Sequence, residues 1–375
     1  SMLGADDPRE TIEEAWRLLM DCQFHDQICG CCTDEVANGM KGRFSAVLKK
    51  CREVMSGAAR SICAKGKPAG DGSLSLLVFN PLSFQVRSWV ECEVERPPGW
   101  KAFRVFEGDR ELPLQLLDAA EYGDGTFKRA RFGLLPELPP LGFKLLRLVR
   151  AEAEGEYPGH VSVVGTTLSN GLLSVEIDPR HGLLREAVLA DGTRFDLSGG
   201  NRLTLERDFG DLYNAFAPGI TFLRPRRFDS LRVLERGPLR ATVEVRGTIG
   251  RSPFVQKMSL TSGSPRLDCL TWVNFRNPGC RLRLRFPTGM AGGRWVHEVP
   301  YGWMERPGHE LPAQNFVNLS EEGAGLALIN YGIPGNKCDG GTIFLTLLRS
   351  TEKIYAWDSG PDALELGKHN FCYSL

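Results

Sequence analysis

A change of pattern at residues 65–72 divides the chain into a short helical part and a long part built from strands. The segment KGKPAGDG at these positions has the glycine and proline content of a linker. Before it, apolar residues recur at steps of three and four, as on one face of a helix. After it, short apolar runs are separated by glycine and proline, which is typical of a β-sandwich. We therefore expect a mainly β chain with an N-terminal α-helical bundle.

The helical part is expected to cover residues 1–66. Asp7 precedes a proline and can cap a first helix, whose apolar stripe of Ile12, Trp16 and Leu19 ends beside His25. A second stripe at helical spacing spans residues 44–62, and a short separate helix is expected to begin at residues 33–36 between the two. We expect both stripes to pack as the core of a small bundle.

The β part is expected to form two domains. Residues 72–150 contain strand-like segments at 74–79, 86–94, 103–106, 127–132 and 143–148, which predict a small β-sandwich. A second glycine- and proline-containing segment, 151–159, precedes a longer alternating region. Residues 158–375 are about twice as many as the first sandwich holds, so we expect one large two-sheet sandwich rather than two small ones.

Composition excludes several classes of function. The 46 Lys and Arg residues balance 46 Asp and Glu residues, so neither nucleic acid nor an anionic membrane is an expected partner. No apolar run approaches the roughly 20 residues that span a bilayer. The eleven cysteines are scattered and odd in number, which favours reduced thiols and a cytoplasmic protein. Cys29, Cys31 and Cys32 could bind a soft metal, but no second cysteine pair follows at zinc-site spacing.

His25 and Asp26 stand side by side where the first helical stripe ends. A helix end leaves backbone groups unpaired and lets neighbouring side chains point into a cleft, so such a pair suits a ligand site. The alternative is a partly buried structural histidine, which is the more common role of a lone imidazole.

The motif around this pair resembles the middle domain of glycoside hydrolase family 38, the α-mannosidases. The resemblance rests on Trp16-Arg17-Leu18-Leu19, then Gln23-Phe24-His25-Asp26, then Gly30. Segments in the order that the family shows follow at residues 75–83 (ending VFNPLS), 168–175 (LSNGLLSV), 298–302 (EVPYG), 325–330 (GLALIN) and 347–350 (LLRS). The collinear motifs cover nearly the whole chain. The resemblance implies that the large sandwich is a mutarotase-like supersandwich.

The resemblance also implies roles for single residues. His25 matches a histidine ligand of the catalytic zinc, and Asp26 matches an aspartate that contacts the sugar. The segment DFGDLYN at 208–214 is similar to a loop of the large sandwich that reaches the active site, which makes Asp211 and Tyr213 candidate sugar-binding residues. The alternative for this segment is an ordinary β-turn with an exposed carboxylate and a packed tyrosine. Cys31 and Cys32 stand where the family has serine or threonine, which can cap a helix better than a thiol.

No catalytic residue is expected within this chain. In the family, the nucleophile and the other zinc ligands come from an α/β-barrel-like domain that precedes the helical one, and residues 1–65 show no alternating strands and helices. Ser1-Met2 resembles a cloning remnant, and the chain stops within a strand-like segment, so we expect a fragment that is inactive and empty of metal on its own. The parent would be a zinc-dependent retaining enzyme that hydrolyses terminal α-mannosides. Its partners would be a mannoside or oligosaccharide and its own N-terminal catalytic domain.

Two other classes of function stay open from the sequence. One is a non-catalytic carbohydrate-binding or scaffolding β protein, for which Trp100, Trp295 and Trp303 would form a surface platform. The other is an epimerase-like sugar enzyme, which needs histidine and glutamate to converge in one cleft. The candidates for that pair are His181, His297 and Glu298.

Overall fold

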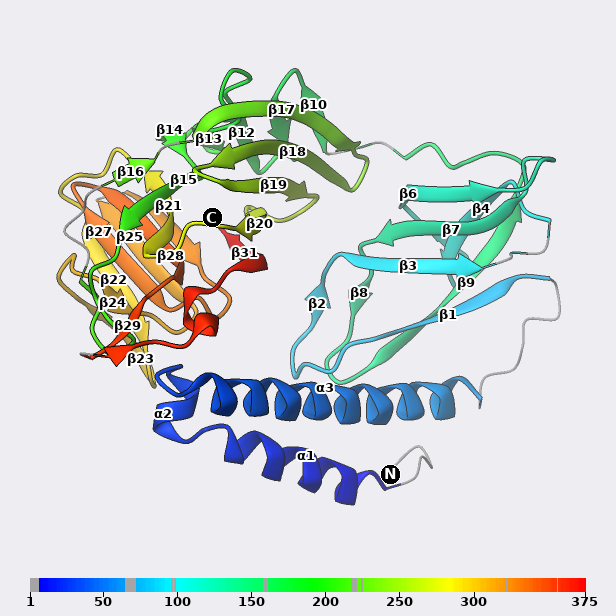
Figure 1. Cartoon of the computed structure of the whole chain (residues 1–375). Coiled ribbons are helices and arrows are strands. Elements are labelled where there is room, and N and C mark those ends of the chain that lie inside the picture. Colours follow the sequence, from blue (N-terminus) through cyan, green and yellow to red (C-terminus); the bar gives the residue numbers. More distant parts are fainter. Residues whose placement is uncertain are drawn as a thin grey trace.

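Helices and sheets occupy separate parts of the chain, as a computed structural model shows (Figure 1). The structure describes residues 7–64, 72–95, 97, 99–157, 159, 161–216, 221–223, 225–321, 323–355 and 357–375. A pair of long helices lies beneath two β regions, a smaller one that follows the helices in the chain and a larger one that contains the C-terminus. The mainly β fold with an N-terminal helical part is confirmed. The predicted linker at 65–72 lies outside the described residues except for Gly72.

The helical part consists of α1 (Arg9–Asp21), the single turn α2 (His25–Ile28) and the long α3 (Asp34–Cys63). Asp7 accepts a hydrogen bond from the Arg9 amide at 3.1 Å, but α1 begins at Arg9 with Pro8 in the N-cap position, so the expected N-cap at Asp7 is wrong by one residue. The Val36 amide donates to the Thr33 hydroxyl at 3.5 Å, so Thr33 caps α3. A separate short helix at residues 33–36 is therefore wrong, because these residues begin α3 itself, and the short helix lies earlier at His25.

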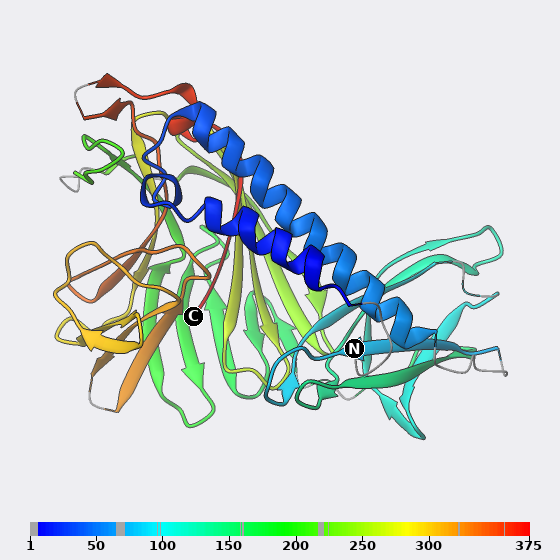
Figure 2. The same cartoon turned by 90° about the horizontal axis from the view of Figure 1, so that it is seen from below.

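The two apolar stripes do not form the expected buried core. Trp16 is 59% exposed and Ile12 41% exposed, and in the described part of α3 the residue that is buried is Met40 rather than a member of the stripe. Each helix covers only one side of the other, and two helices alone cannot enclose a core. The stripes therefore line a groove between α1 and α3. In Figure 2, α3 runs obliquely from the larger β region to the smaller one.

The small sandwich follows the helices. Its first sheet has the order β1-β9-β4-β5 and its second β3-β7-β6, with a two-stranded ribbon β2-β8 beside them. Their core includes Trp100, Phe103, Phe132 and Leu148. The expected strand over 86–94 is interrupted. The strands are β1 (Leu74–Phe79), β2 (Val86–Arg87), β3 (Val90–Glu95), β4 (Ala102–Glu107), β5 (Arg110–Leu112), β6 (Leu114–Glu121), β7 (Phe127–Leu134), β8 (Glu137–Leu138) and β9 (Phe143–Ala151).

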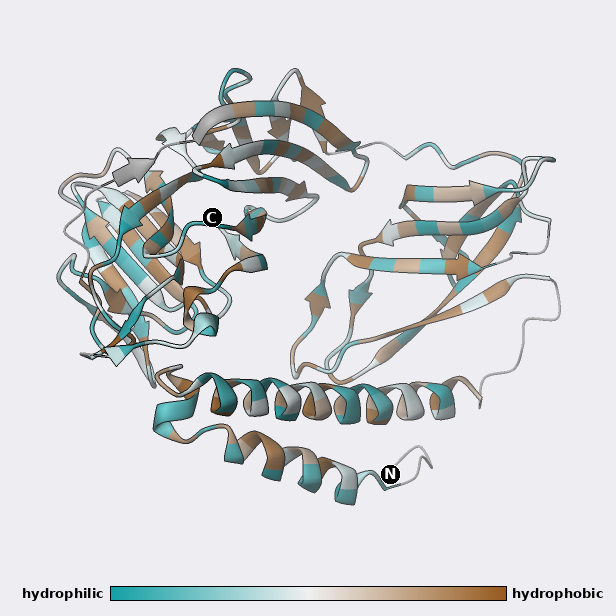
Figure 3. Cartoon of the chain, in the orientation of Figure 1, coloured by the Kyte–Doolittle hydropathy of each residue, from teal (hydrophilic) through white to brown (hydrophobic). Residues whose placement is uncertain are grey.

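The large β region holds sheets of five, six and nine strands around one continuous core. Its strand β20 (Leu267–Phe275) alternates buried and half-buried residues along its whole length. Figure 3 shows hydrophobic and hydrophilic bands along the strands of this region. The five-stranded sheet runs β10 to β14 in order: β10 (Ser162–Val164), β11 (Thr167–Ser169), β12 (Leu173–Ile177), β13 (Leu184–Leu189) and β14 (Arg194–Gly200).

The six-stranded sheet carries the face that later sections use. Its order is β16 (Thr221–Leu223), β15 (Arg202–Arg207), β21 (Cys280–Pro287), β28 (Thr342–Arg349), β27 (Gly335–Asp339) and β24 (Leu311–Pro312). The nine-stranded sheet has the order β17 (Pro225–Arg236), β18 (Arg240–Ile249), β19 (Ser252–Thr261), β20 (Leu267–Phe275), β31 (Gly367–Ser374), β26 (Ala324–Ile329), β25 (Phe316–Glu321), β22 (Arg294–Val299) and β23 (Gly302–Glu305). The ribbon β29 (Lys353–Ile354) and β30 (Trp357–Asp358) and the 3-10 helix η1 (Pro361–Leu364) precede β31.

Specific polar contacts join the three parts. Gln115 of the small sandwich donates to the Arg240 carbonyl at 3.0 Å and accepts from the Arg240 amide at 2.8 Å. At the other end, Asn38 and Lys41 of α3 donate to the Asp362 carboxylate of η1 at 3.0 and 3.2 Å. These contacts fix the start of α3 against the large sandwich. The domain limits 1–66, 72–150 and 158–375 stay predictions.

No helix within the described residues is long and apolar enough to cross a membrane.

Candidate functional site

The single-turn helix α2 presents both residues of the opening pair to solvent. The distance from His25 Nε2 to Asp26 Oδ1 is 3.3 Å, and the two side chains are 77% and 45% exposed. The ring of Phe24 lies 4.4 Å from the imidazole, centroid to centroid, and limits how that ring can turn. Exposure and a neighbouring carboxylate leave the imidazole available for a ligand, which a buried structural histidine would not be.

The turn after α2 meets the loop that follows β15. The Tyr213 hydroxyl lies 3.4 Å from the Cys31 carbonyl oxygen, and its ring stacks on Tyr355 at 4.4 Å with an 18° angle between planes. The neighbouring Cys31 side chain, followed by desolvation, raises the pKa of Tyr213 to about 12. The phenol therefore keeps its proton at neutral pH. The adjacent residues His25 and Asp26 and the distant Tyr213 thus lie on two segments that are in direct contact.

Asp211 shapes this loop through its own carboxylate. Its Oδ1 accepts the backbone amides of Tyr213 and Asn214, both at 2.7 Å. The Asn214 amide is the main reason that the pKa of Asp211 is lowered. The turn foreseen as an alternative is therefore present, although a turn does not conflict with sugar binding because Oδ2 keeps unused acceptor capacity.

A buried charge cluster that the sequence did not reveal braces the same loop. Arg349 donates to Asp208 at 2.7 Å and to the Asp211 carbonyl at 3.1 Å. Arg281, 1% exposed, donates to the same Asp208 oxygen at 3.2 Å. Burial alone would raise the pKa of Asp208, but the hydrogen bond from Arg349 and the two guanidinium charges hold it below its ordinary value. Such a paired carboxylate fixes where the loop leaves the sheet.

The cysteines near α2 act within the local structure. The Cys29 and Cys31 sulfurs are 2.8 Å apart, and the Cys31 thiol donates to the Asp26 carbonyl at 3.6 Å. Burial, followed by the contact with Cys29, raises the pKa of Cys31. Neither Cys31 nor Cys32 caps α3, since Thr33 does so. All eleven cysteines are free thiols.

The donors near α2 fit part of a metal site rather than a whole one. Among the described residues no group of three or more His, Cys, Asp and Glu side chains is placed to hold a metal ion. Protein zinc sites use three or four ligands, with imidazole nitrogen and carboxylate oxygen among the preferred donors. His25 and Asp26 therefore suit a contribution to a site completed by other ligands.

The residues of the two alternative functions do not converge. Trp100 and Trp295 are 2% and 4% exposed and belong to the cores, so of the three proposed platform residues Trp303 alone lies at the surface, at 61%. His297 is fully buried. His181 instead pairs with Asp178 at 2.8 Å, and Glu298 accepts from the Asn315 amide at 2.8 Å. The separate partners of His181 and Glu298 and the burial of His297 give no support to an epimerase-like cleft. The burial of Trp100 and Trp295 gives none to an aromatic platform.

Comparison with known proteins gives two family matches that together cover most of the chain. Residues 1–62 match the alpha mannosidase middle domain, and residues 168–362 match the C-terminal domain of glycosyl hydrolases family 38. Alpha-mannosidase 2C1 of Homo sapiens is 27% identical over 98% of this chain, and alpha-mannosidase G of Dictyostelium discoideum is 22% identical over 97%. The chain spans about a third of the length of these relatives, 34% and 36%.

The fold agrees with these matches. An alpha-mannosidase from Enterococcus faecalis V583 superimposes over 98% of this chain and 50% of its own, with a TM-score of 0.85 at 19% identity. The expected family and the expected sandwich architecture are therefore confirmed. The middle-domain match, residues 1–62, contains α2, and the C-terminal-domain match, residues 168–362, contains the Tyr213 loop. This chain belongs to glycoside hydrolase family 38 and carries its middle and C-terminal domains.

Proposed function

We propose that this chain is the helical and β portion of a zinc-dependent retaining α-mannosidase that hydrolyses terminal α-mannosides. The proposal is supported chiefly by the contact between Tyr213 and the turn after α2, because it gathers a possible metal ligand and polar sugar-binding groups on one surface. The mannosidase names of the relatives give the substrate class.

Each side chain has a role that follows from its chemistry. His25 would hold zinc through a neutral imidazole nitrogen, and zinc bound there supplies Lewis-acid chemistry toward sugar hydroxyls. Asp26 can accept hydrogen bonds from those hydroxyls, while the protonated Tyr213 can donate one. Asp211 holds the turn that sets the direction of Tyr213 and can also meet the sugar through Oδ2. Together these groups bind and orient a mannoside and form one wall of its pocket.

The reacting carboxylates would come from outside these residues. A retaining glycosidase needs a nucleophile and an acid/base carboxyl about 5–5.5 Å apart. Asp26 and Asp211 are instead engaged with an imidazole and with backbone amides. We therefore propose a barrel-like catalytic domain as the partner of α2, and we expect these 375 residues alone to be inactive.

The test measures nitrophenol release from an aryl α-mannoside with zinc present. The chain alone should give no turnover. Turnover by the chain that disappears in the His25→Ala variant would overturn the proposed division of the site.

In a protein that joins this chain to a family 38 catalytic domain, His25→Ala should lower both zinc content and turnover. Tyr213→Phe should raise KM while zinc content is unchanged. Tyr355→Phe is the matched control, because it also removes one hydroxyl from the stacked pair. The Tyr355 hydroxyl has no hydrogen-bond partner among the described residues. Equal effects of the two tyrosine variants would exclude the role given to Tyr213.

A further inference from the structure

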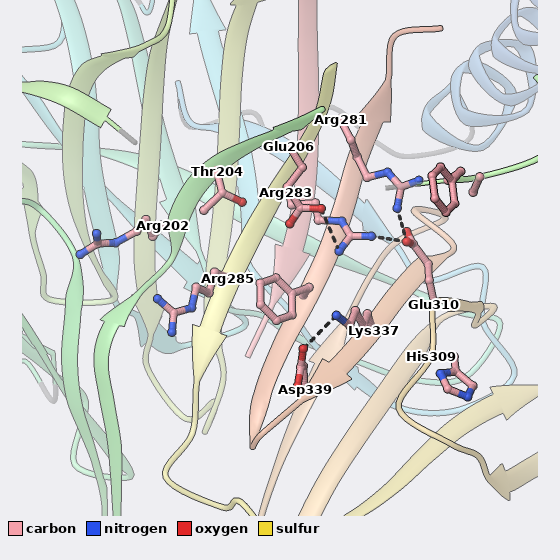
Figure 4. Close-up of a pocket in the computed structure, with 13 residues that line it drawn as sticks. Arg202, Thr204, Glu206, Arg281, Arg283, Arg285, His309, Glu310, Lys337 and Asp339 are labelled. Carbon is pink, nitrogen blue, oxygen red and sulfur yellow. Dashed lines mark hydrogen bonds and ion pairs between the residues drawn. The ribbon is translucent and has the colours of Figure 1, made fainter. Parts of the chain in front are cut away.

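The outer face of the six-stranded sheet carries an unusual row of arginines. On β21 the core-facing Leu282, Leu284 and Phe286 alternate with Arg281, Arg283 and Arg285. The arginines line a cavity of about 570 Å³ with residues of β15, β27 and β28 (Figure 4). Five cationic side chains line it against three carboxylates: Arg202, Arg281, Arg283, Arg285 and Lys337 against Glu206, Glu310 and Asp339. The cavity is therefore net positive.

At one end of this cavity the protein supplies its own counter-charges. Arg281 lies opposite Arg349 in the strand register, and Asp208 accepts hydrogen bonds from both. Glu310 accepts from Arg281 and also from Arg283, which lies two residues further along β21 on the same face. Two neighbouring arginines can share a buried site when a carboxylate lies between them, since the attraction offsets their repulsion.

At the other end Arg285 itself has no such carboxylate among the described residues. Arg285 lies directly opposite Arg202 on β15, and like charges in such a cross-strand pair destabilise a sheet. The described residues give Arg285 no ion pair and no hydrogen bond. On its other side Arg285 faces Phe344, whose own neighbour in the next strand is Lys337. In Figure 4 the guanidinium groups of Arg202 and Arg285 lie on the side of the cavity away from Glu310.

Two buried polar atoms in the row between these ends also lack partners. Thr204 and Arg283 face each other in register and are 5% and 3% exposed. The Thr204 hydroxyl and the Arg283 Nε have no hydrogen-bond partner within the described structure. An unsatisfied buried donor costs about 1–3 kcal/mol, so such groups are normally met by a ligand or by water.

From these observations we propose that this cavity is a binding site for a small organic anion, held through a phosphate or carboxylate group by Arg285, Arg283 and Thr204. Guanidinium groups bind oxyanions through paired, charge-assisted hydrogen bonds, and a threonine hydroxyl can add another. The cavity is larger than an inorganic anion requires, and Phe344 gives it an apolar wall, so an attached organic group fits better than a bare ion. This site does not depend on the proposed mannosidase function.

Calorimetric titration of the chain with inorganic phosphate and with acetate, at constant ionic strength in sodium chloride, tests the proposal. We expect saturable binding of at least one of the two, and the stronger one identifies the anionic group. Arg285→Gln should weaken it about tenfold or more, because a charge-assisted bond is lost, and Thr204→Val should weaken it less. Arg232→Gln on the exposed outer edge of β17 is the control for a general loss of positive charge, and it should bind as the unmodified chain does.

Thermal unfolding gives a second readout that does not require tight binding. Without added anion, Arg285→Gln should melt no lower than the unmodified chain, because within the described residues the Arg285 side chain has no ion pair or hydrogen bond to lose. Phosphate or acetate should raise the melting temperature of the unmodified chain and of Arg232→Gln, but not of Arg285→Gln. Absence of saturable binding of either probe, or equal losses in Arg285→Gln and Arg232→Gln, would overturn the proposed site.

Discussion

Acid should destabilise the large sandwich through one histidine. His297 lies on β22 between Val317 and Met304 in the strand register and is fully buried. Neither ring nitrogen has a hydrogen-bond partner within the described residues. Burial, with a smaller contribution from the charge of Arg306, lowers the pKa of His297 from 6.5 to about 4. The folded protein therefore keeps this imidazole neutral under conditions in which the unfolded chain takes up a proton.

The sign and size of the effect follow from the two pKa values. Between pH 6.5 and pH 4 the unfolded state binds more protons, so the free energy of unfolding falls as the pH falls. From pH 7 to pH 5 the loss should be about 2 kcal/mol, and it approaches its limit below the folded pKa. The His297→Asn variant cannot titrate and should lack this part of the pH dependence, whatever its stability at pH 7.

Urea unfolding at pH 7 and at pH 5 measures the difference. Trp295, whose ring lies 5.0 Å from that of His297, provides a fluorescence signal from the same sheet. The His309→Asn variant is the control, because His309 is exposed and has no ion pair or hydrogen bond in the described structure. If His297→Asn loses as much stability as the unmodified chain between the two pH values, the inferred neutral state of His297 is wrong.

Two further predictions concern a turn and a domain contact. Gly182 has φ +68°, and a Cβ there would lie 2.5 Å from Val245, so Gly182→Ala should lower the free energy of unfolding by about 2–4 kcal/mol. Gly165 also has a positive φ, +60°, but open space surrounds it, so Gly165→Ala should lower the free energy of unfolding by only about 1 kcal/mol. Chemical denaturation of both variants would separate the clash from the backbone strain, and equal losses would exclude the clash. Gln115→Leu should expose the amide of Arg240 to hydrogen exchange, because this contact joins the two sandwiches, and unchanged protection would show that other contacts suffice.

The sequence predicted most of the β architecture because strand periodicity is a local property. The segment at 74–79 coincides with β1, and the alternation at residues 281–286 with β21. The helical part was harder. Spacing alone did not show that residues 33–36 continue into a thirty-residue α3, because a start signal does not fix a helix's length. Nor did it show that the stripe of Trp16 would stay exposed, since burial depends on what packs against it.

The candidate site was predictable where the family resemblance supplied it and not where distant strands create it. His25, Asp26 and Tyr213 were named from motifs, and the contact between their segments agrees with that grouping, while their roles stay predictions. The bracing of the loop by Asp208 could not be deduced. Its partners come from β21 and β28, more than seventy residues away, and strand register is set by long-range pairing.

One strand links the Tyr213 loop and the proposed anion site without making them one site. Arg281 holds Asp208 at the base of the loop, whereas Arg285 lies four residues along β21, about 13 Å away at the rise of a strand. Between them lies Arg283, which already forms ion pairs with Glu206 and Glu310. These paired charges screen Asp208 from a change of charge at Arg285. Binding of an anion beside Arg285 should therefore stabilise the sheet but leave the hydrogen bond between Tyr213 and Cys31 unchanged.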